Sequence, residues 1–185
     1  MRGSGGSPRL ARFPKAWRAE AGVIDVDRSR PPVVIDGRVL NEMCAHGLET
    51  WPEECCGLVT GKARGMHDRV HRCRNDMTLL HRGDPTCHPR DGRAAFHMNE
   101  SDALRACREA EAAGEQVTAI YHSHVGARAC FSELDQECAS LEVFPFPDAD
   151  HIVIALAERR VRELALFRRD VRGGFVGRAV VAATP

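Results

Sequence analysis

Two histidines separated by a single residue, His122 and His124, directly follow an apolar run that is typical of a β-strand. Side chains two residues apart on a strand point to the same face, so both imidazoles can bind one divalent metal ion at about 2.0–2.1 Å. Asp135, expected one turn into the next helix, could supply an oxygen as third ligand. Three protein ligands leave a fourth tetrahedral position for water, which is typical of a catalytic rather than a structural zinc site.

Each part of this pattern also has a simpler interpretation. The chain contains nine histidines, so a His-x-His pair by itself is weak evidence for a metal site. Ser132 and Asp135 have the spacing of a helix start, in which Ser132 caps the N-terminus and Asp135 lies near the positive end of the helix dipole. Capping and metal binding do not exclude one another, because a helix N-terminus can direct both side chains towards an ion. The residues alone leave both interpretations open.

The complete spacing His122-x-His124-x7-Ser132-x2-Asp135 resembles the JAMM signature of the MPN-domain zinc metallopeptidases. Those proteins also carry an upstream strand that reads Glu-x-Cys-Gly-hydrophobic. Residues 54–58 of this chain read Glu-Cys-Cys-Gly-Leu and look like the bacterial form of that strand. The resemblance to the small bacterial members covers about residues 33–170, which is nearly the whole of the expected domain.

The resemblance implies a role for each matching position. His122, His124 and Asp135 would bind one Zn²⁺ per chain. Glu54 would accept a proton from the attacking water and later transfer it to the leaving amine. Ser132 would donate a hydrogen bond to the oxyanion of the tetrahedral intermediate. The sequence therefore predicts Glu54 and Ser132 as catalytic residues beside a zinc site.

Two details of the motif need separate treatment. Glu53 and Glu54 are adjacent, so on a strand their side chains face opposite sides and only one of them can reach the metal site. The Glu-x-Cys-Gly frame selects Glu54 and leaves Glu53 in solvent.

Val125 and Phe131 stand where many members of the family carry proline, which changes the loop between the ligands but removes none of them.

The family resemblance further implies a zinc-dependent peptidase of compact bacterial type. Its expected substrate is an amide, either a peptide or an isopeptide, at the C-terminal Gly-Gly-type tail of a ubiquitin-like or sulfur-carrier protein. The alternative is a catalytically inactive MPN scaffold that binds a partner protein, but such members typically lack some of the ligands that this chain retains. A zinc nucleobase deaminase would need a Cys-x-x-Cys pair, which the chain lacks. A homodimer is left open.

Composition excludes several other classes of protein. The 185 residues include 26 basic and 26 acidic side chains, and this zero net charge argues against a nucleic-acid partner. The longest apolar run, residues 152–157, is far shorter than the roughly 20 residues that span a bilayer, so no membrane partner is expected. The eight cysteines are expected to be free thiols in a cytoplasmic protein, because no apolar export signal follows the basic start.

Two regions are expected along the chain. Residues 1–32, basic at the start and interrupted by glycine and proline, predict a flexible N-terminal tail, and residues 33–182 predict a single metallopeptidase domain. An irregular, substrate-facing loop is predicted at residues 76–93. Strands are predicted at 33–35, 55–60, 69–73, 93–98, 117–121, 152–156, 161–167 and 175–181, and helices at 40–48, 100–113 and 133–141.

This order of elements predicts an α/β or α+β fold with a mixed sheet. The resemblance specifies it as an MPN/JAMM-type three-layer fold, in which helices flank a curved mixed sheet. The second helix is expected to bury Leu104, Cys107 and Ala110, and the third Leu134, Cys138 and Leu141. His67 and Arg168 are expected at the surface.

Overall fold

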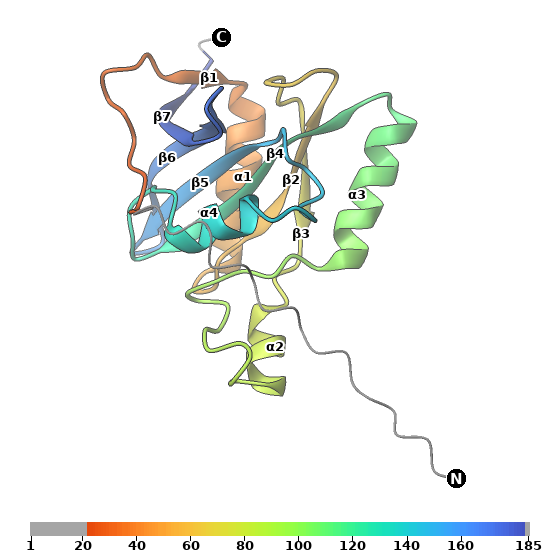
Figure 1. The fold of residues 1–185 in the computed structure, drawn as a ribbon, viewed down its shortest axis with the longest axis vertical. Helices are drawn as coiled ribbons and strands as arrows, with labels where there is room; N and C mark the ends of the chain where they lie inside the picture. The colour runs from red at the N-terminus through yellow and green to blue at the C-terminus, as the bar shows by residue number, and fades with distance from the viewer. Residues whose placement is uncertain (1–21, 184–185) are drawn as a thin grey trace.

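The computed structural model describes residues 22–183. The strands are β1 (Val33–Ile35), β2 (Cys56–Gly61), β3 (Arg69–Cys73), β4 (Gln116–Val125), β5 (Asp150–Ala157), β6 (Arg160–Arg169) and β7 (Phe175–Ala182), and the helices are α1 (Gly37–Thr50), α2 (Met77–Gly83), α3 (Glu100–Ala112) and α4 (Glu133–Ala139). The seven strands form one curved sheet in the order β1-β7-β6-β5-β4-β2-β3 (Figure 1). β1 is parallel to β7 and β4 to β5, while the other pairs are antiparallel, so the predicted mixed sheet is confirmed.

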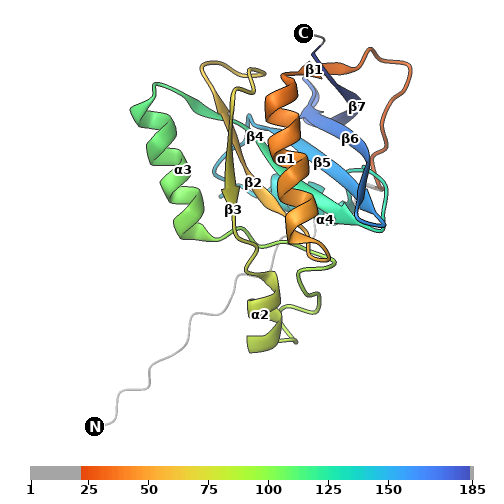
Figure 2. The same ribbon diagram turned by 180° about the vertical axis from the view of Figure 1, so that it is seen from behind.

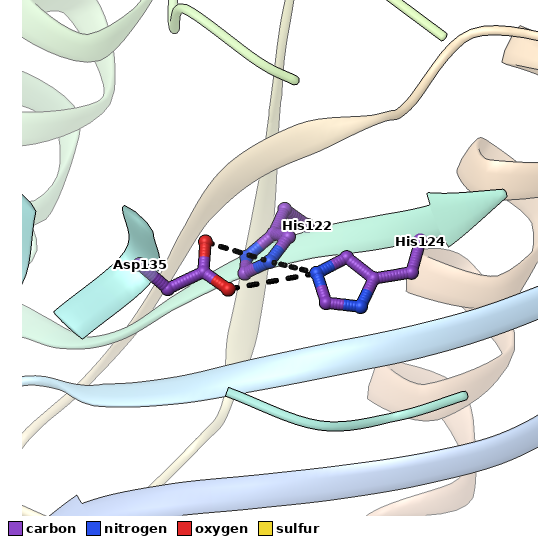
Figure 3. Close-up of side chains that lie close together, drawn as sticks. All are labelled: His122, His124 and Asp135. Atoms are coloured by element: carbon purple, nitrogen blue, oxygen red, sulfur yellow. Dashed lines mark hydrogen bonds and ion pairs between the residues drawn. The ribbon is translucent and has the colours of Figure 1, made fainter. Parts of the chain in front are cut away.

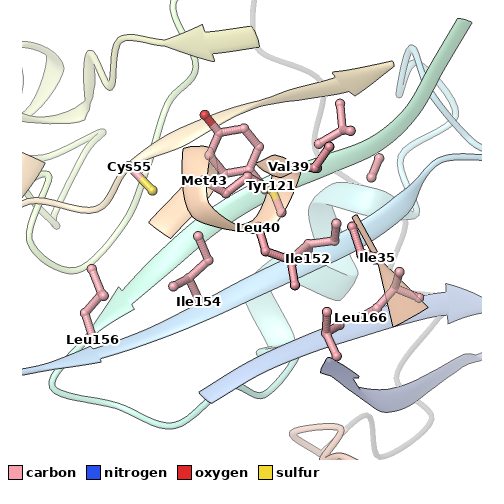
Figure 4. Close-up of a cluster of buried hydrophobic side chains, with 13 residues drawn as sticks. Ile35, Val39, Leu40, Met43, Cys55, Tyr121, Ile152, Ile154, Leu156 and Leu166 are labelled. Carbon is pink, nitrogen blue, oxygen red and sulfur yellow. The ribbon is translucent and has the colours of Figure 1, made fainter. Parts of the chain in front are cut away.

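Helices cover both faces of this sheet and give the predicted three layers (Figures 1 and 2). On one face, α1 inserts Met43 into a cluster with Tyr121 and aliphatic side chains of β5 (Figure 4). On the other face, Ala106 of α3 packs with Ile120, and Ala139 of α4 packs over β5 and β6. Ile120 and Tyr121 fall in different clusters because successive residues of a strand face opposite sides.

The centre of the sheet brings distant parts of the chain to one end. β4 lies between β2 and β5, and its C-terminal end carries both His122 and His124. Because β2 is antiparallel to β4, the beginning of β2 lies beside the end of β4, with Cys56 opposite His122. Glu54 precedes Cys56 by two residues and therefore reaches the same end and the same face.

Most of the predicted elements are present. The strands predicted at 33–35 and 69–73 have those bounds, and the strands predicted at 152–156 and 161–167 are β5 and β6, joined at Glu158 and Arg159, both of which have positive φ. The helix predicted at 100–113 is α3, which Asn99 caps because its side chain accepts a hydrogen bond from the Asp102 N–H. These elements carry strong local signals, namely alternation, turn residues and a capping side chain.

The prediction of an irregular loop at 76–93 is wrong in part, and the strand predicted at 93–98 is wrong. The former segment contains α2, which has no buried residue and projects from the body of the molecule (Figure 1). The latter forms only an isolated bridge between Asn75 and Met98. The two segments meet at Asn75, whose side chain accepts from the backbone N–H groups of Met77 and His97 where a regular strand pair would use backbone carbonyls.

The buried faces of two helices differ in part from the prediction. α3 buries Ala110 as predicted and also Ala106, while Leu104 is 52% exposed. α4 ends at Ala139, before the predicted Leu141, and its Leu134 side chain lies in solvent. Alanine at the contact positions lets each helix lie close to the sheet, so the small residues rather than the leucines mark the packed face.

His67, expected at the surface, is buried, and Arg168 is partly exposed as expected but reaches inward to the same buried carboxylate as His67. The carboxylate of Asp150 is fully buried and accepts a hydrogen bond of 2.7 Å from Nε of Arg168, which lies in β6 rather than in a turn. Nε2 of His67 lies 3.3 Å from the same carboxylate, and its Nδ1 lies 3.1 Å from the hydroxyl of Thr118. The network links β4, β5 and β6 at the end of the sheet away from His122.

The expected tail is described only from residue 22 onwards, because residues 1–21 lie outside the described part of the chain. Residues 22–32 run along the outside of the sheet to β1 (Figure 1). Ile24 and Phe131 form one isolated bridge, and Val26 and Gly177 form another. Backbone contacts with the domain therefore begin before residue 33.

Two expectations concern the chain as a whole. Between residues 22 and 183, no helix combines the length and the apolar character needed to cross a bilayer. All eight cysteines fall within this range and are free thiols, as predicted.

Candidate metal centre

The three predicted metal ligands, His122, His124 and Asp135, converge between β4 and α4 (Figure 3). Nε2 of His122 lies 3.1 Å from Nε2 of His124. The carboxylate of Asp135 lies 3.4 Å from Nε2 of His122 and 3.5 Å from Nε2 of His124. His122 is 2% exposed, and the side chains of His124 and Asp135 are 12% and 11% exposed, so the cluster is largely buried but reached by solvent.

These distances fit a tetrahedral metal ion. Ligand atoms at about 2.0–2.1 Å from a tetrahedral zinc lie about 3.3 Å from one another. The two imidazole nitrogens are 3.1 Å apart, and each lies near that distance from a different oxygen of Asp135, His122 at 3.4 Å from Oδ1 and His124 at 3.5 Å from Oδ2. One donor atom from each of the three residues lies within 4.8 Å of the other two. Two imidazole nitrogens and one carboxylate oxygen are also the donor types that Zn²⁺ prefers. The arrangement fits Zn²⁺ with one coordination position left over.

The two imidazoles are held in orientation by different means. Nδ1 of His124 donates to the backbone carbonyl of Arg128 at 3.1 Å, which leaves the lone pair on Nε2 and directs it into the cluster. His122 is stacked against Phe96, with ring centroids 4.7 Å apart. Nδ1 of His122 is buried and has no hydrogen-bond partner among the described residues. His124 thus has a fixed tautomer, while His122 is fixed by packing.

Asp135 reaches the cluster from the first turn of α4. Ser132 caps this helix, and the two residues form a capping box in which the Ser132 hydroxyl accepts from the Asp135 N–H at 3.1 Å. The same hydroxyl donates to Oδ2 of Asp135 at 2.7 Å. Burial opposes ionisation of Asp135, but the adjacent histidines hold the pKa of its carboxyl far below the usual range. Ser132 therefore caps the helix and also positions a carboxylate beside the imidazoles.

Glu54 lies beside this cluster with its side chain buried, at 6% exposure. Burial raises the pKa of Glu54 to about 7, against the opposing effect of His122 and His124. Its backbone is fixed on both sides, because its N–H donates to Gly92 at 2.7 Å and its carbonyl accepts from the Asn75 side chain at 3.0 Å. A carboxyl group that titrates near neutral pH is suited to accept and return a proton.

Glu53 is not free in solvent, contrary to the prediction. Its carboxylate accepts a hydrogen bond of 2.7 Å from the Thr78 hydroxyl, which in turn accepts from the Gly92 N–H at 2.9 Å. A Cβ on Gly92 would lie 2.9 Å from the same carboxylate, so the loop approaches Glu53 closely. Glu53 thus attaches the α2 segment to the residue next to Glu54.

Asn75 belongs to the site although no motif pointed to it. Its amide nitrogen donates to the carbonyls of Glu54 and Ala95, and its amide oxygen accepts from the N–H groups of Met77 and His97. One side chain therefore joins the Glu54 segment, the start of α2 and the residues on either side of Phe96. The available signal was weak, since an asparagine after a strand predicts only a turn.

Comparison with known proteins gives consistent matches. A family described as prokaryotic homologs of the JAB domain matches residues 36–169. The CysO-cysteine peptidases of Mycobacterium bovis and Mycobacterium tuberculosis are 29% identical to this chain over 136 residues, which is 74% of this chain and 82% of those proteins. The tail tip assembly protein K of Escherichia phage N15 is 33% identical over 116 residues, 63% of this chain and 38% of that protein.

Two solved structures share the fold. A protein from Desulfitobacterium hafniense gives a TM-score of 0.58 at 20% identity, over 82% of this chain and 93% of that one. A protein from Salinibacter ruber gives a TM-score of 0.53 at 22% identity, over 82% and 92%. At these identities the likeness concerns the fold alone.

Proposed function

Because the chain belongs to the family of prokaryotic JAB-domain homologues, as its resemblance to small bacterial JAMM/MPN proteins indicated, we propose that it is a zinc-dependent peptidase. Its substrate is an amide, peptide or isopeptide, at the C-terminal tail of a ubiquitin-like or sulfur-carrier protein. The name of the mycobacterial relatives supports hydrolysis of an adduct between such a carrier and an amino acid. The single observation that carries the proposal is the convergence of two imidazoles and one carboxylate beside the buried Glu54.

His122, His124 and Asp135 would hold the metal. When bound, Zn²⁺ would supply a Lewis acid that lowers the pKa of water to about 7 and polarises the scissile carbonyl. Glu54 would accept the proton of the attacking water and deliver it to the leaving nitrogen. Its fixed backbone and buried carboxyl suit this role, which is worth typically about 10²–10⁴-fold in rate.

Ser132 would stabilise the oxyanion of the tetrahedral intermediate. In the free protein its hydroxyl donates to Asp135, so it must turn from that carboxylate to the substrate oxygen. The helix cap limits the reorganisation to one rotation, because the Ser132 backbone is already fixed by its bond to Oδ2 of Asp135 at 2.9 Å. One such donor contributes about 10²–10³-fold to kcat.

The substrate tail would lie extended across the open side of the metal centre. A Gly-Gly-type tail suits this path, since residues without side chains can pass close to buried ligands and pair with backbone groups. The alternative of an inactive scaffold is less well supported, because the ligand set is complete and the buried acid stands beside it.

The test uses the full chain and a sulfur-carrier protein whose C-terminal carboxyl is joined to cysteine by an amide bond. Intact mass should decrease by one cysteine, chelator should stop the reaction, and added Zn²⁺ should restore it. Glu54→Gln should keep bound zinc, measured by elemental analysis, and lose at least about 100-fold in rate. Glu53→Gln, the adjacent control, should keep most of the activity.

His124→Ala should lose both zinc and activity. If the zinc-loaded protein binds the carrier tightly but leaves its adducts intact, the peptidase proposal is wrong and the inactive scaffold is the better account. Hydrolysis at the unaltered rate by Glu54→Gln would remove Glu54 from the proposed chemistry.

A further inference from the structure

The loop between the proposed metal ligands is paired with a segment that precedes the matched family region. Residues 22–28 run beside the loop 126–131, which joins His124 at the end of β4 to Ser132 at the start of α4. The Ile24 N–H donates to the Phe131 carbonyl at 3.0 Å, and the Phe131 N–H donates to the Ile24 carbonyl at 2.9 Å. This reciprocal exchange is the contact of an antiparallel strand pair.

Two side chains strengthen the same contact. Nε of Arg128 donates to the carboxylate of Asp25 at 2.9 Å. Gln136, the neighbour of Asp135 in α4, donates to the carbonyls of Gly22 and Phe131, at 3.1 Å in each case. The segment is therefore tied to the loop and to the helix that presents the carboxylate ligand.

The segment has a firm attachment on its other side. The Asp27 N–H donates to the Gly177 carbonyl of β7 at 2.9 Å. A Cβ at Gly177 would lie 2.6 Å from the Asp25 carbonyl, so only glycine allows this approach. Ile24 and Val26 also pack against the cluster that contains the fully buried Phe131. The sheet thus supports the segment, and the segment supports the loop.

Phe131 is one of the positions where the sequence departs from the proline of the JAMM pattern. Proline has no N–H and could not donate to Ile24. Phenylalanine in place of proline at position 131 is therefore what allows the loop to pair with Ile24. The loop also holds a partner of His124 outside the cluster, since the Arg128 carbonyl accepts from Nδ1 of His124 at 3.1 Å.

We propose that residues 22–28 are a brace that positions His124 for metal binding through the loop 126–131. The proposal rests on the proposed function in so far as His124 is a metal ligand. The Arg128 carbonyl also accepts from the Cys130 N–H at 3.0 Å, so the brace acts on the loop as a whole. Without the brace, the loop that carries this carbonyl is held less firmly, and the hydrogen bond that selects the tautomer and direction of His124 is weakened. The brace residues are positioning residues, because none of them enters the metal cluster.

The test uses point variants of the full chain. Ile24→Pro removes the N–H that pairs with Phe131, and Asp25→Ala removes the partner of Arg128. Arg28→Ala is the matched control, since Arg28 lies in the same segment but pairs with Glu163 of β6 at 2.8 Å, away from the loop. Each variant is measured for zinc affinity by chelator competition and for the His124 tautomer by nitrogen NMR of the metal-free protein at alkaline pH, where the ring is neutral.

Ile24→Pro should weaken zinc binding about tenfold, as loss of a group that orients a ligand does, and should lower the fraction of the Nδ1–H tautomer of His124. Asp25→Ala should weaken zinc binding up to about fivefold, because it removes an exposed ion pair. Exchanging the charges, as Asp25→Arg with Arg128→Glu, should restore part of the loss. Arg28→Ala should change neither readout.

Unchanged zinc affinity and tautomer in both test variants would overturn the brace, as would an equal effect of Arg28→Ala. If Ile24→Pro does not fold, Asp25→Ala and the charge exchange decide. The tautomer is read without metal or substrate, so these outcomes stay separate from the proposed function. If the His124 tautomer responds to changes in the brace but the protein cleaves no carrier adduct, the brace proposal stands and the peptidase proposal fails.

Discussion

The ring of Phe96 lies almost parallel to the imidazole of His122, with centroids 4.7 Å apart and planes 25° apart. Phe96 comes from the segment that Asn75 ties to Glu54, and His122 from the centre of the sheet. The stack therefore joins the buried ligand to the part of the chain that carries the proposed acid–base residue. Among the described residues, Phe96 is the phenyl ring that stacks on His122.

Phe96→Ala should weaken zinc binding, because His122 then loses its packing partner and becomes hydrated. An aromatic pair is worth about 0.5–1.5 kcal/mol beyond its buried area, so the zinc dissociation constant should rise about 2–12-fold. Phe96→Leu is the matched control, since it keeps an apolar cover without an aromatic face and should retain part of the affinity. Chelator competition measures both. Equal zinc affinity in Phe96→Ala and the unaltered protein would contradict this role.

Asn75→Ala should lower kcat and stability together, because it leaves two backbone carbonyls and two N–H groups without their partners. The loss of unfolding free energy should be about 1–3 kcal/mol, and displacement of Glu54 should lower kcat about tenfold or more. Asn75→Asp keeps the acceptor for Met77 and His97 but cannot donate to Glu54 and Ala95. Denaturant unfolding and initial rates separate the two effects.

If the connection to Glu54 matters, Asn75→Asp should lose activity beyond what its loss of stability explains. Full kcat in both variants, after correction for the folded fraction, would reduce Asn75 to a loop residue.

The three side chains of the candidate metal site could be named from the sequence because the spacing of the JAMM signature relates them. Strand alternation places His122 and His124 on one face, and Asp135 follows Ser132 by one helical turn, but only the resemblance indicated that the strand and the helix meet. Glu54 was found differently, through the frame of a motif, and the antiparallel register of β2 and β4 explains why that frame works.

The supporting contacts were not predictable in the same way. Asn75 and the brace bind backbone groups of segments that are distant in sequence, and such contacts leave no periodic pattern and need no particular side-chain type in the partner. Ile24 pairs through its main chain, so residues 22–28 read as tail. The predicted burial of Leu104 is wrong for a different reason. A leucine on a helix predicts burial, but α3 packs closely against the sheet through the smaller Ala106, which leaves Leu104 exposed.

Acid should destabilise the protein in part through Asp150. Burial opposes ionisation of this carboxyl, but hydrogen bonds from Arg168 and His67 outweigh it and lower the pKa of Asp150 in the folded state. A lowered pKa contributes stability that is complete above the unfolded value of about 3.9 and is lost as pH falls through the folded value. Asp150→Asn should therefore reduce the fall in Tm below pH about 4.

At neutral pH the same variant should lose about 1–3 kcal/mol, a modest amount because Arg168 is 40% exposed and can be rehydrated. Asp148→Asn is the control, since Asp148 pairs with Arg64 in the open and is 84% exposed. Thermal unfolding between pH 3 and 7 measures both. An unchanged acid slope in Asp150→Asn would show that other carboxyls dominate acid unfolding.

Ser132→Ala separates the two roles of this hydroxyl. Loss of the N-cap should cost about 1 kcal/mol of stability, whereas loss of an oxyanion donor should lower kcat about 10²–10³-fold with little change in KM. Asn99→Ala removes the cap of α3 and the contacts of Asn99 with Arg74 and Asp76 and leaves the cluster intact, so it reports an upper limit for the cost of uncapping. Steady-state rates on a carrier adduct and thermal unfolding give both quantities. A Ser132→Ala enzyme with unaltered kcat and the same stability loss as Asn99→Ala would assign Ser132 to capping only, because the carboxylate of Asp135 would then reach the imidazoles without its help.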